Sequence, residues 1–256
     1  MPKTIAVFNQ AGGVGKSTLT QNLGYQLAAR NNRVLLVDMD PQGSLTLFMG
    51  FELEELESTI YDALLPESEA ETHEPPIIGD RHGMDLVPSN IRLANAEQEL
   101  IFEQLREMRL GDVLSTVSGQ YDYILIDCPP SLGILSQISL VAATHLLVPI
   151  QCQFKSLMGT DGLLRTVSQV RKRLNPELQF AGFVPTMYQR NNSLDNRILG
   201  EIQEQLEKVA PVFAPMPRAT AVAEAAELGV PLALSTNKHA ATLKLFDQLA
   251  AVMEKM

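Results

Sequence analysis

Residues 4–18 read TIAVFNQAGGVGKST, and this stretch decides the fold class. Thr4–Asn9 predicts a buried β-strand, and helical spacing follows the glycines to about Arg30. Glycines between a strand and a helix permit a tight turn whose backbone N–H groups converge on phosphate oxygens. The helix N-terminus adds the positive end of its dipole. The stretch therefore predicts a phosphate-binding P-loop made of Gly12, Gly13, Val14, Gly15, Lys16, Ser17 and Thr18.

Two side chains of this loop carry the expected chemistry. Lys16 would reach the β- and γ-phosphates of a nucleotide, and the Ser17 hydroxyl would bind Mg²⁺. The alternative is a chance glycine-rich turn with a solvated lysine, but the position between a strand and a helix argues against it. The general P-loop pattern begins with a glycine where this chain has Gln10.

Short apolar runs alternate with helix-length segments along the rest of the chain. Helical spacing is found at Thr59–Leu65, from Leu93 to about Ser118, and in the C-terminal segment. Further strands are predicted at Arg33–Asp38, Met84–Pro88, Tyr123–Asp127, His145–Ile150 and Gln179–Pro185. Near-continuous apolar strands are typical of a parallel sheet that helices cover on both faces. The sequence therefore predicts an α/β fold with a doubly wound, mostly parallel sheet, and residues 1–256 as a single domain.

Carboxylates follow two of the predicted strands. Asp38 and Asp40 end one strand, and Asp127 ends another. In a doubly wound sheet the ligand lies at the carboxyl ends of the strands, where the P-loop also lies. Asp127 is expected to be the Walker-B acid, which holds Mg²⁺ through its water shell. A single acid after a strand is more often a helix cap, but three acids in this order favour a site.

Composition narrows the function classes. The chain has 256 residues, 45% of them hydrophobic, and a net charge of −10, so it is expected to be a soluble, cytoplasmic protein without a coat of DNA-binding charge. No apolar run approaches the roughly 20 residues of a membrane helix. The first residues are predicted to enter a strand at once, so no signal peptide is expected. The acidic stretch Glu52–Pro76 is expected to be a solvated excursion.

The cysteines and histidines suggest no separate site. Cys128 and Cys152 are too few for a disulfide framework, although an iron–sulfur cluster shared across a dimer is an alternative. A small buried residue is the simpler interpretation of Cys128. The histidines are scattered without metal-ligand spacing: His73, His82, His145 and His239.

The motifs resemble those of the deviant-Walker ATPases of the ParA/Soj/MinD family, which are P-loop NTPases. The resemblance covers nearly the whole chain and is carried by Asn9–Ser17, Asp38–Gln42, Leu86–Asn90, Ile126–Pro130, Leu147–Pro149 and Pro185–Tyr188. It implies a protein that binds and hydrolyses ATP with Mg²⁺ and forms a homodimer around ATP. By the same resemblance, Asp40 positions the attacking water and Asp38 supports the metal and the dimer interface. The residues implied near adenine are Thr186, Met187 and Pro217, with Asn192 also contacting the nucleotide region.

The chain departs from the family at the signature lysine, which crosses the dimer to the partner's ATP. Ala11 stands at that position. Since phosphoryl transfer depends on positioning and charge neutralisation, loss of this lysine is expected to weaken hydrolysis, the dimer or both, unless another cation substitutes. Lys155, beyond the end of the strand His145–Ile150, is the candidate, and Arg190 and Arg218 compete with it. A family member without this lysine resembles the McdA group, which positions carboxysomes over the nucleoid.

The resemblance also implies a surface on which the protein acts. Lysines in the C-terminal segment are balanced by acids, so a packed helix is expected there rather than a membrane-binding one. Non-specific DNA binding is expected instead, with a nucleoid-associated location and a small McdB-like or ParB-like adaptor that stimulates hydrolysis. The predicted DNA contacts are Arg165, Arg171, Lys172 and Arg173, which Arg197, Lys238 and Lys244 could join in a dimer. Alternatives are a plasmid or chromosome partition ATPase and, in another class, a metabolic P-loop phosphotransferase or ligase.

Overall fold

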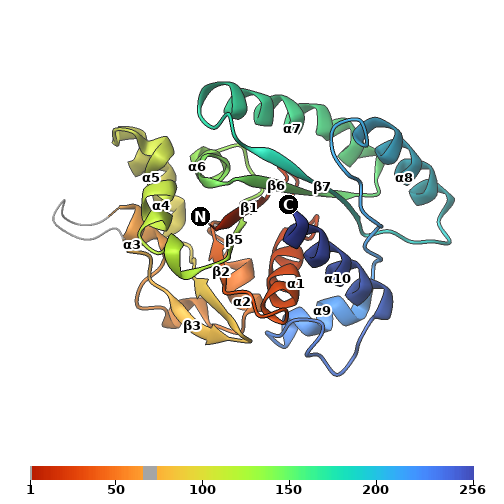
Figure 1. The fold of residues 1–256 in the computed structure, drawn as a ribbon, viewed down its shortest axis with the longest axis horizontal. Helices are drawn as coiled ribbons and strands as arrows, with labels where there is room; N and C mark the ends of the chain where they lie inside the picture. Colours follow the sequence, from red (N-terminus) through yellow and green to blue (C-terminus); the bar gives the residue numbers. More distant parts are fainter. Residues whose placement is uncertain (1, 66–73) are drawn as a thin grey trace.

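A computed structural model describes residues 2–65 and 74–256 of the chain. Its centre is a seven-stranded sheet with the order β3-β4-β2-β5-β1-β6-β7 (Figure 1). The strands are β1 (Lys3–Val7), β2 (Val34–Asp38), β3 (Ile78–Arg81), β4 (Met84–Val87), β5 (Tyr123–Asp127), β6 (His145–Gln151) and β7 (Gln179–Thr186). Neighbouring strands are parallel except for the β3–β4 pair. The expected α/β class with a mostly parallel, doubly wound sheet is confirmed.

Helices cover both faces of this sheet. They are α1 (Lys16–Ala28), α2 (Ser44–Phe48), α3 (Ile60–Leu64), α4 (Leu93–Glu99), α5 (Arg109–Ser115), α6 (Ile134–Ala142), α7 (Phe154–Arg173), α8 (Ser193–Leu206), α9 (Thr220–Glu227) and α10 (Ala240–Lys255), with short 3-10 turns η1 (Leu53–Glu55), η2 (Leu100–Phe102), η3 (Arg106–Met108) and η4 (Ser118–Gln120). Because side chains alternate along a strand, Ile5 and Val7 pack with α1 and α10, whereas Ala6 and Phe8 pack on the side of α5, α6 and α7.

One sequence expectation is wrong, and one strand was not predicted. The segment from Leu93 to Ser118 is not one helix, because α4 and α5 are separated by η2 and η3. Leu105, between the two turns, has a φ of 52°, a left-handed conformation that a right-handed helix cannot include. The antiparallel edge strand β3 was not predicted, since only part of it is apolar and its side chains are partly exposed. Part of the expected acidic excursion, together with His73, lies outside the described residues.

The C-terminal helix is packed, as expected. Leu245, Phe246 and Leu249 of α10 are buried in the core against α1. Arg30, just after the end of α1, forms ion pairs with Asp247 and Glu254 of α10. No helix in the described part of the chain is both long and apolar enough to span a membrane.

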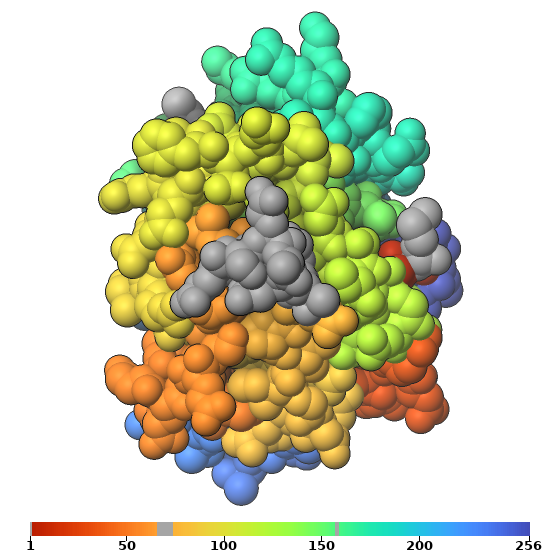
Figure 2. Space-filling view, turned by 90° about the vertical axis from the view of Figure 1, so that its left-hand side faces the viewer, coloured from red at the N-terminus to blue at the C-terminus, as the bar shows by residue number. Residues whose placement is uncertain are grey.

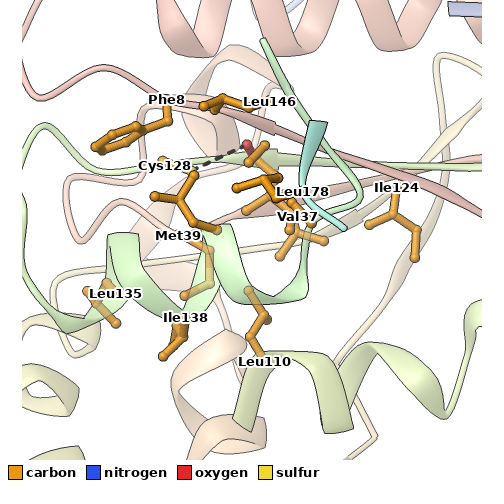
Figure 3. Packing of buried hydrophobic residues seen from close by; sticks show 14 of the residues in the cluster. Phe8, Val37, Met39, Leu110, Ile124, Cys128, Leu135, Ile138, Leu146 and Leu178 are labelled. Atoms are coloured by element: carbon orange, nitrogen blue, oxygen red, sulfur yellow. Dashed lines mark hydrogen bonds between the residues drawn. The ribbon is translucent and has the colours of Figure 1, made fainter. Parts of the chain in front are cut away.

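The sheet register places three strand ends side by side. Val7 of β1 and Asp38 of β2 are each opposite Asp127 of β5. The residues that follow these ends, Phe8, Met39 and Cys128, belong to one buried cluster, and Figure 3 shows them in this core. The P-loop and the acids predicted to act with it therefore begin from a rigid, buried row.

Candidate functional site

The P-loop leads from β1 into α1 through glycines with positive φ. Gly13 has a φ of 70°, and Gly15, the N-cap of α1, has a φ of 89°. Residues that carry a Cβ rarely adopt such left-handed conformations. Lys16 begins the helix and is only 7% exposed. Its ammonium donates to the backbone oxygens of Asn9 at 3.1 Å and Ala11 at 3.0 Å. The lysine therefore points back over the loop, in the space that phosphates occupy in a P-loop.

Two opposing effects act on the pKa of Lys16. Burial lowers its pKa, while the carboxylates of Asp127 and Asp40 act in the opposite direction. A buried ammonium held only by neutral carbonyls is poorly compensated. Phosphate oxygens would supply the missing negative charge.

Asp127 is the acid that the surrounding protein satisfies least. It is fully buried, and neither carboxylate oxygen has a hydrogen-bond partner among the described residues. Burial raises its pKa well above the usual value, and the charge of Asp38 adds to this rise. The Ser17 hydroxyl is near enough to act in the opposite direction, although it is not within hydrogen-bonding geometry of either oxygen. An orphaned carboxylate beside a serine hydroxyl fits a Mg²⁺ site.

The same carboxylate would not hold the ion unaided. In residues 2–65 and 74–256, no group of three or more His, Cys, Asp or Glu side chains is arranged to bind a metal. Mg²⁺ commonly keeps several waters and takes its remaining ligands from one or two protein groups and substrate phosphates. Ser17, Asp127 and the phosphates of a nucleotide would form such a set.

Asp38, by contrast, is fully paired. Its carboxylate accepts hydrogen bonds from the Thr46 backbone N–H at 2.9 Å, the Thr46 hydroxyl at 2.8 Å and the Asp40 N–H at 3.1 Å. Burial nevertheless raises the pKa of Asp38 to about 7, because desolvation outweighs these bonds. Asp40 is 8% exposed, and one of its oxygens accepts from the Gln42 N–H. Asp38 thus fixes the loop that carries Asp40 toward the phosphate site.

Side chains from β6 and β7 support the P-loop from below, and the sequence analysis had missed this role. The Thr186 hydroxyl donates to the Val14 carbonyl at 2.9 Å, and the Gln151 amide donates to the Gly13 carbonyl at 2.8 Å. Asn9 donates to the Pro149 carbonyl at 2.7 Å. Thr186, expected near adenine, is fully buried beneath the loop. Only its position at the end of β7 could have pointed to this contact.

A pocket of about 890 Å³ adjoins the P-loop at the start of α1. Met187 and Pro217, expected near adenine, both line it, as do Asn192 and Arg218. The Asn192 side chain also caps α8 by accepting from the Leu194 N–H. The volume of the pocket is within the range of small-molecule sites, and we refer to it as the nucleoside pocket because it contains residues expected near adenine.

A second pocket, of about 490 Å³, lies on the other side of the loop and contains both Ala11 and Lys155. Lys155 is exposed in the first turn of α7 and has no ion pair within the described ranges. Gln10, on the same wall, donates to the Gly159 carbonyl of α7 at 3.0 Å. Arg190 lines neither pocket, although it is exposed. Of the cations considered for the role of the missing lysine, Lys155 is therefore the one beside Ala11.

The predicted DNA-contacting residues share one helix. Arg165, Arg171, Lys172 and Arg173 are all exposed on α7. Arg197 lies next to Glu201, with 3.8 Å between charged groups, so its charge is partly compensated. Lys244 is on α10, which packs on the opposite face of the sheet (Figure 1). Within one protomer Lys244 does not join the cluster on α7.

The cysteines lie in different surroundings. Cys128 is fully buried in the core beside the Walker acid, and burial raises the pKa of its thiol. Cys152 lines the 890 Å³ pocket, and burial raises its thiol pKa to about 12. Without a bound metal, burial therefore favours the protonated form of both thiols.

Comparison with known proteins agrees with this geometry. A protein-family profile described as "AAA domain" matches residues 2–180. The chromosome partitioning protein ParA of Caulobacter vibrioides is 40% identical over 235 residues, covering 91% of this chain and 86% of the relative. The sporulation initiation inhibitor protein Soj of Bacillus subtilis is 40% identical over 235 residues, covering 91% of each chain.

Solved structures show the same fold. A cobyrinic acid a,c-diamide synthase from Mycobacterium smegmatis with bound ADP and magnesium has a TM-score of 0.84 and 33% identity, covering 100% of this chain and 95% of that one. The apo McdA of Cyanothece has a TM-score of 0.87 over 99% of this chain and 100% of that one. At 23% identity, the latter likeness concerns the fold alone.

Proposed function

The chain belongs to the ParA/MinD family of P-loop proteins, and from this premise we propose that it is an ATP-driven positioning switch. ATP and Mg²⁺ are its cofactors, in line with the solved relatives that hold ADP or an ATP analogue with magnesium. ATP closes a homodimer that binds nucleoid DNA without sequence preference. An adaptor protein then stimulates hydrolysis and releases the dimer.

One observation carries the ATP- and Mg²⁺-binding part of this proposal: Asp127 is buried, unpaired among the described residues and next to the P-loop. An unpaired buried carboxylate is costly unless a cation joins it. Mg²⁺ would neutralise charge on the phosphates as hydrolysis proceeds. Lys16 would orient the phosphates, Ser17 and Asp127 would hold the ion, and Asp40 would position a water. Asp38 would act through the Thr46 contacts that fix the Asp40 loop.

Lys155 would supply the cation that Ala11 lacks. It shares a pocket with Ala11 beside the P-loop and is free of ion pairs within the described residues. A dimer closed over this face would carry the ammonium toward the partner's nucleotide. Charge neutralisation of this kind contributes strongly to phosphoryl transfer.

The cargo can be proposed at two levels. The absence of the signature lysine at position 11 favours a carboxysome-distributing protein with an McdB-like adaptor. Identity of 40% with ParA of Caulobacter vibrioides and Soj of Bacillus subtilis favours chromosome or plasmid partition with a ParB-like adaptor. Imaging of the tagged protein together with carboxysomes and with the chromosome origin would separate these cargoes.

Binding to non-specific duplex DNA tests the switch. It is measured with ATP–Mg²⁺, ADP–Mg²⁺ and no nucleotide over a salt series, because phosphate contacts make affinity fall steeply with salt. Salt-sensitive binding with ATP alone is the expected result. Equal binding in every nucleotide state would contradict an ATP-dependent switch. No binding in any state would contradict binding to nucleoid DNA.

A second candidate rests on the likeness to the cobyrinic acid a,c-diamide synthase at 33% identity. Under that alternative, the chain uses ATP to drive the modification of a small molecule. ATP turnover that rises with a small carboxylic acid and ammonia, but not with DNA and a protein partner, would support it. The opposite pattern would support the positioning switch.

A further inference from the structure

A pocket of about 300 Å³ lies between α6 and α7, away from the nucleoside pocket. Phe8, Leu140 and Val170 line it with buried apolar side chains. Leu132 and Arg173 also line it and are exposed, so they form its rim. Such a pocket accepts an apolar group of about the size of one large side chain.

The rim carries one kind of charge. Of the described residues that line the pocket, Arg173 alone is charged, and no ion pair to it occurs in the described ranges. A guanidinium fork matches a carboxylate in a bidentate arrangement. The complementary ligand therefore combines an apolar group with a neighbouring carboxylate.

Further exposed apolar side chains lie near α6. The turn η3 packs against α6, and the segment around it leaves Ile101, Phe102 and Leu105 exposed by 57%, 87% and 78%. Figure 2 shows the yellow surface around residues 95–110 and the teal surface around residues 165–175 on the same face of the molecule. Exposed apolar surface of this extent is typical of contacts with another protein. A small molecule confined to the pocket would leave these side chains uncovered.

The pocket touches both loops of the phosphate site. Phe8, in its wall, immediately precedes Asn9, whose carbonyl oxygen accepts a hydrogen bond from the Lys16 ammonium. Ser136, also in the wall, donates from its hydroxyl to the Ser131 carbonyl at 2.7 Å, in the loop that follows Asp127. A group bound in the pocket would therefore contact one residue that adjoins the P-loop and one that is hydrogen-bonded to the loop after Asp127.

We propose that the α6–α7 pocket is a docking site for a segment of a partner protein that presents an apolar side chain next to a carboxylate. The apolar side chain enters between Leu140 and Val170, and the carboxylate pairs with Arg173. The partner also covers the exposed side chains around η3. This docking does not require that the chain bind DNA.

The test uses anilinonaphthalene sulfonate, a fluorescent probe with an apolar body and an anionic group. It is titrated into the full chain with Mg²⁺–ADP, and two acetylated tetrapeptide amides, LFDD and its uncharged counterpart LFNN, then compete for the site. Saturable probe binding that LFDD displaces and LFNN does not displace is expected. Fluorescence directly reports occupancy, so the result is independent of ATP turnover and of DNA binding.

Matched variants locate the binding. Arg173→Gln should weaken probe and LFDD binding at least about tenfold, since a bond to a charged group is lost. Arg171→Gln removes the same charge from the same helix outside the pocket and should leave both affinities unchanged. Thr166→Leu and Leu140→Phe each fill the pocket from a different helix and should reduce probe binding. Circular dichroism and melting curves check that each variant is folded.

Three outcomes would overturn the proposal. Probe binding that no pocket variant changes would remove the site. Equal displacement by LFNN and LFDD would show that the ligand's carboxylate does not contribute to binding. Probe binding that depends on Leu140 and Arg173 but yields to neither peptide would make the pocket a small-molecule site.

Discussion

The residue scale is governed by buried charge that the protein itself does not compensate. Asp127 has no hydrogen-bond partner among the described residues, whereas neighbouring Asp38 has several. Among the described residues, the hydrogen bonds of the Lys16 ammonium go only to neutral carbonyls. Keeping such groups buried costs stability in the nucleotide-free protein. Binding of a nucleotide with Mg²⁺ would offset that cost, so the unpaired buried charges would increase the affinity for this ligand.

Replacing Asp127 by Asn should therefore stabilise the protein without nucleotide or Mg²⁺. Burial raises the folded-state pKa of Asp127 above its value of 3.8 in the unfolded chain. The destabilisation is absent below that unfolded value and grows as pH rises from it toward the raised folded value. The melting temperature of Asp127→Asn should match that of wild type near pH 4 and should be higher than that of wild type by pH 8.

Asp112→Asn is the control, because that carboxylate is exposed on α5. Its melting temperature should follow wild type at every pH. Asp127→Asn should also weaken Mg²⁺-dependent ADP binding in calorimetry. A variant less stable than wild type at pH 8 would contradict the interpretation of Asp127 as an unpaired acid.

At the scale of elements, the site depends on contacts between the P-loop and strands distant in sequence. Thr186 at the end of β7 and Gln151 at the end of β6 each bond a P-loop carbonyl. These bonds connect the loop to the half of the sheet that also borders the nucleoside pocket. The orientation of the loop is therefore determined by the sheet as well as by its own glycines.

Thr186→Val should loosen the P-loop. The substitution keeps the side-chain shape but leaves the buried Val14 carbonyl without its donor, at a cost of about 1–3 kcal/mol. Urea denaturation should show that loss, and ADP affinity should fall with it. Thr116→Val removes a similar hydroxyl-to-carbonyl bond at an exposed residue that follows α5 and should cost far less. Equal losses in both variants would contradict a special role for Thr186.

Helix α7 is the element predicted to contact DNA. Arg165 and Lys172 are about two helical turns apart and both exposed, so they lie near one face of the helix. The double variant Arg165→Gln/Lys172→Gln should weaken ATP-dependent DNA binding and make its salt dependence shallower by about 0.9 per lost phosphate contact. Lys208→Gln/Lys255→Gln removes the same charge elsewhere and should bind normally. Equal weakening in both would indicate a net-charge effect.

At the scale of the whole molecule, the proposed dimer would close over the face that holds the P-loop. Ala11 and Lys155 come from opposite halves of the sequence but line one pocket beside the P-loop. A cation introduced at either position would therefore enter the same region. A lysine at position 11 can therefore be tested as a replacement for Lys155.

Lys155→Ala should abolish ATP-dependent dimerisation and lower ATP turnover, because the pocket loses its ammonium. Adding Ala11→Lys to that variant should restore both, since it returns a lysine to the same pocket. Light scattering after size exclusion, with ATP and with ADP, measures the dimer. Lys208→Ala serves as the surface control. Normal dimerisation of Lys155→Ala would direct the search to Arg190 and Arg218.

Sequence patterns predicted the sheet and its helices where burial is continuous. The buried strands β1, β2, β5, β6 and β7, the helix after the P-loop and the packed C-terminal helix all form close to where they were expected. The failures fall where burial is partial. Strand β3 lies at the edge of the sheet, and the Leu93–Ser118 segment turns at Leu105 even though its apolar spacing suits a helix.

The sequence by itself determined the P-loop, the order of the acids and the departure at Ala11, because these depend on local spacing and on residue chemistry. Only the tertiary structure decided that Asp127 is left unpaired while Asp38 is paired, that Thr186 supports the loop, and that Lys155 shares a pocket with Ala11. Each of these depends on contacts between segments far apart along the chain. Such contacts follow from the sheet register and from packing, which local patterns do not encode.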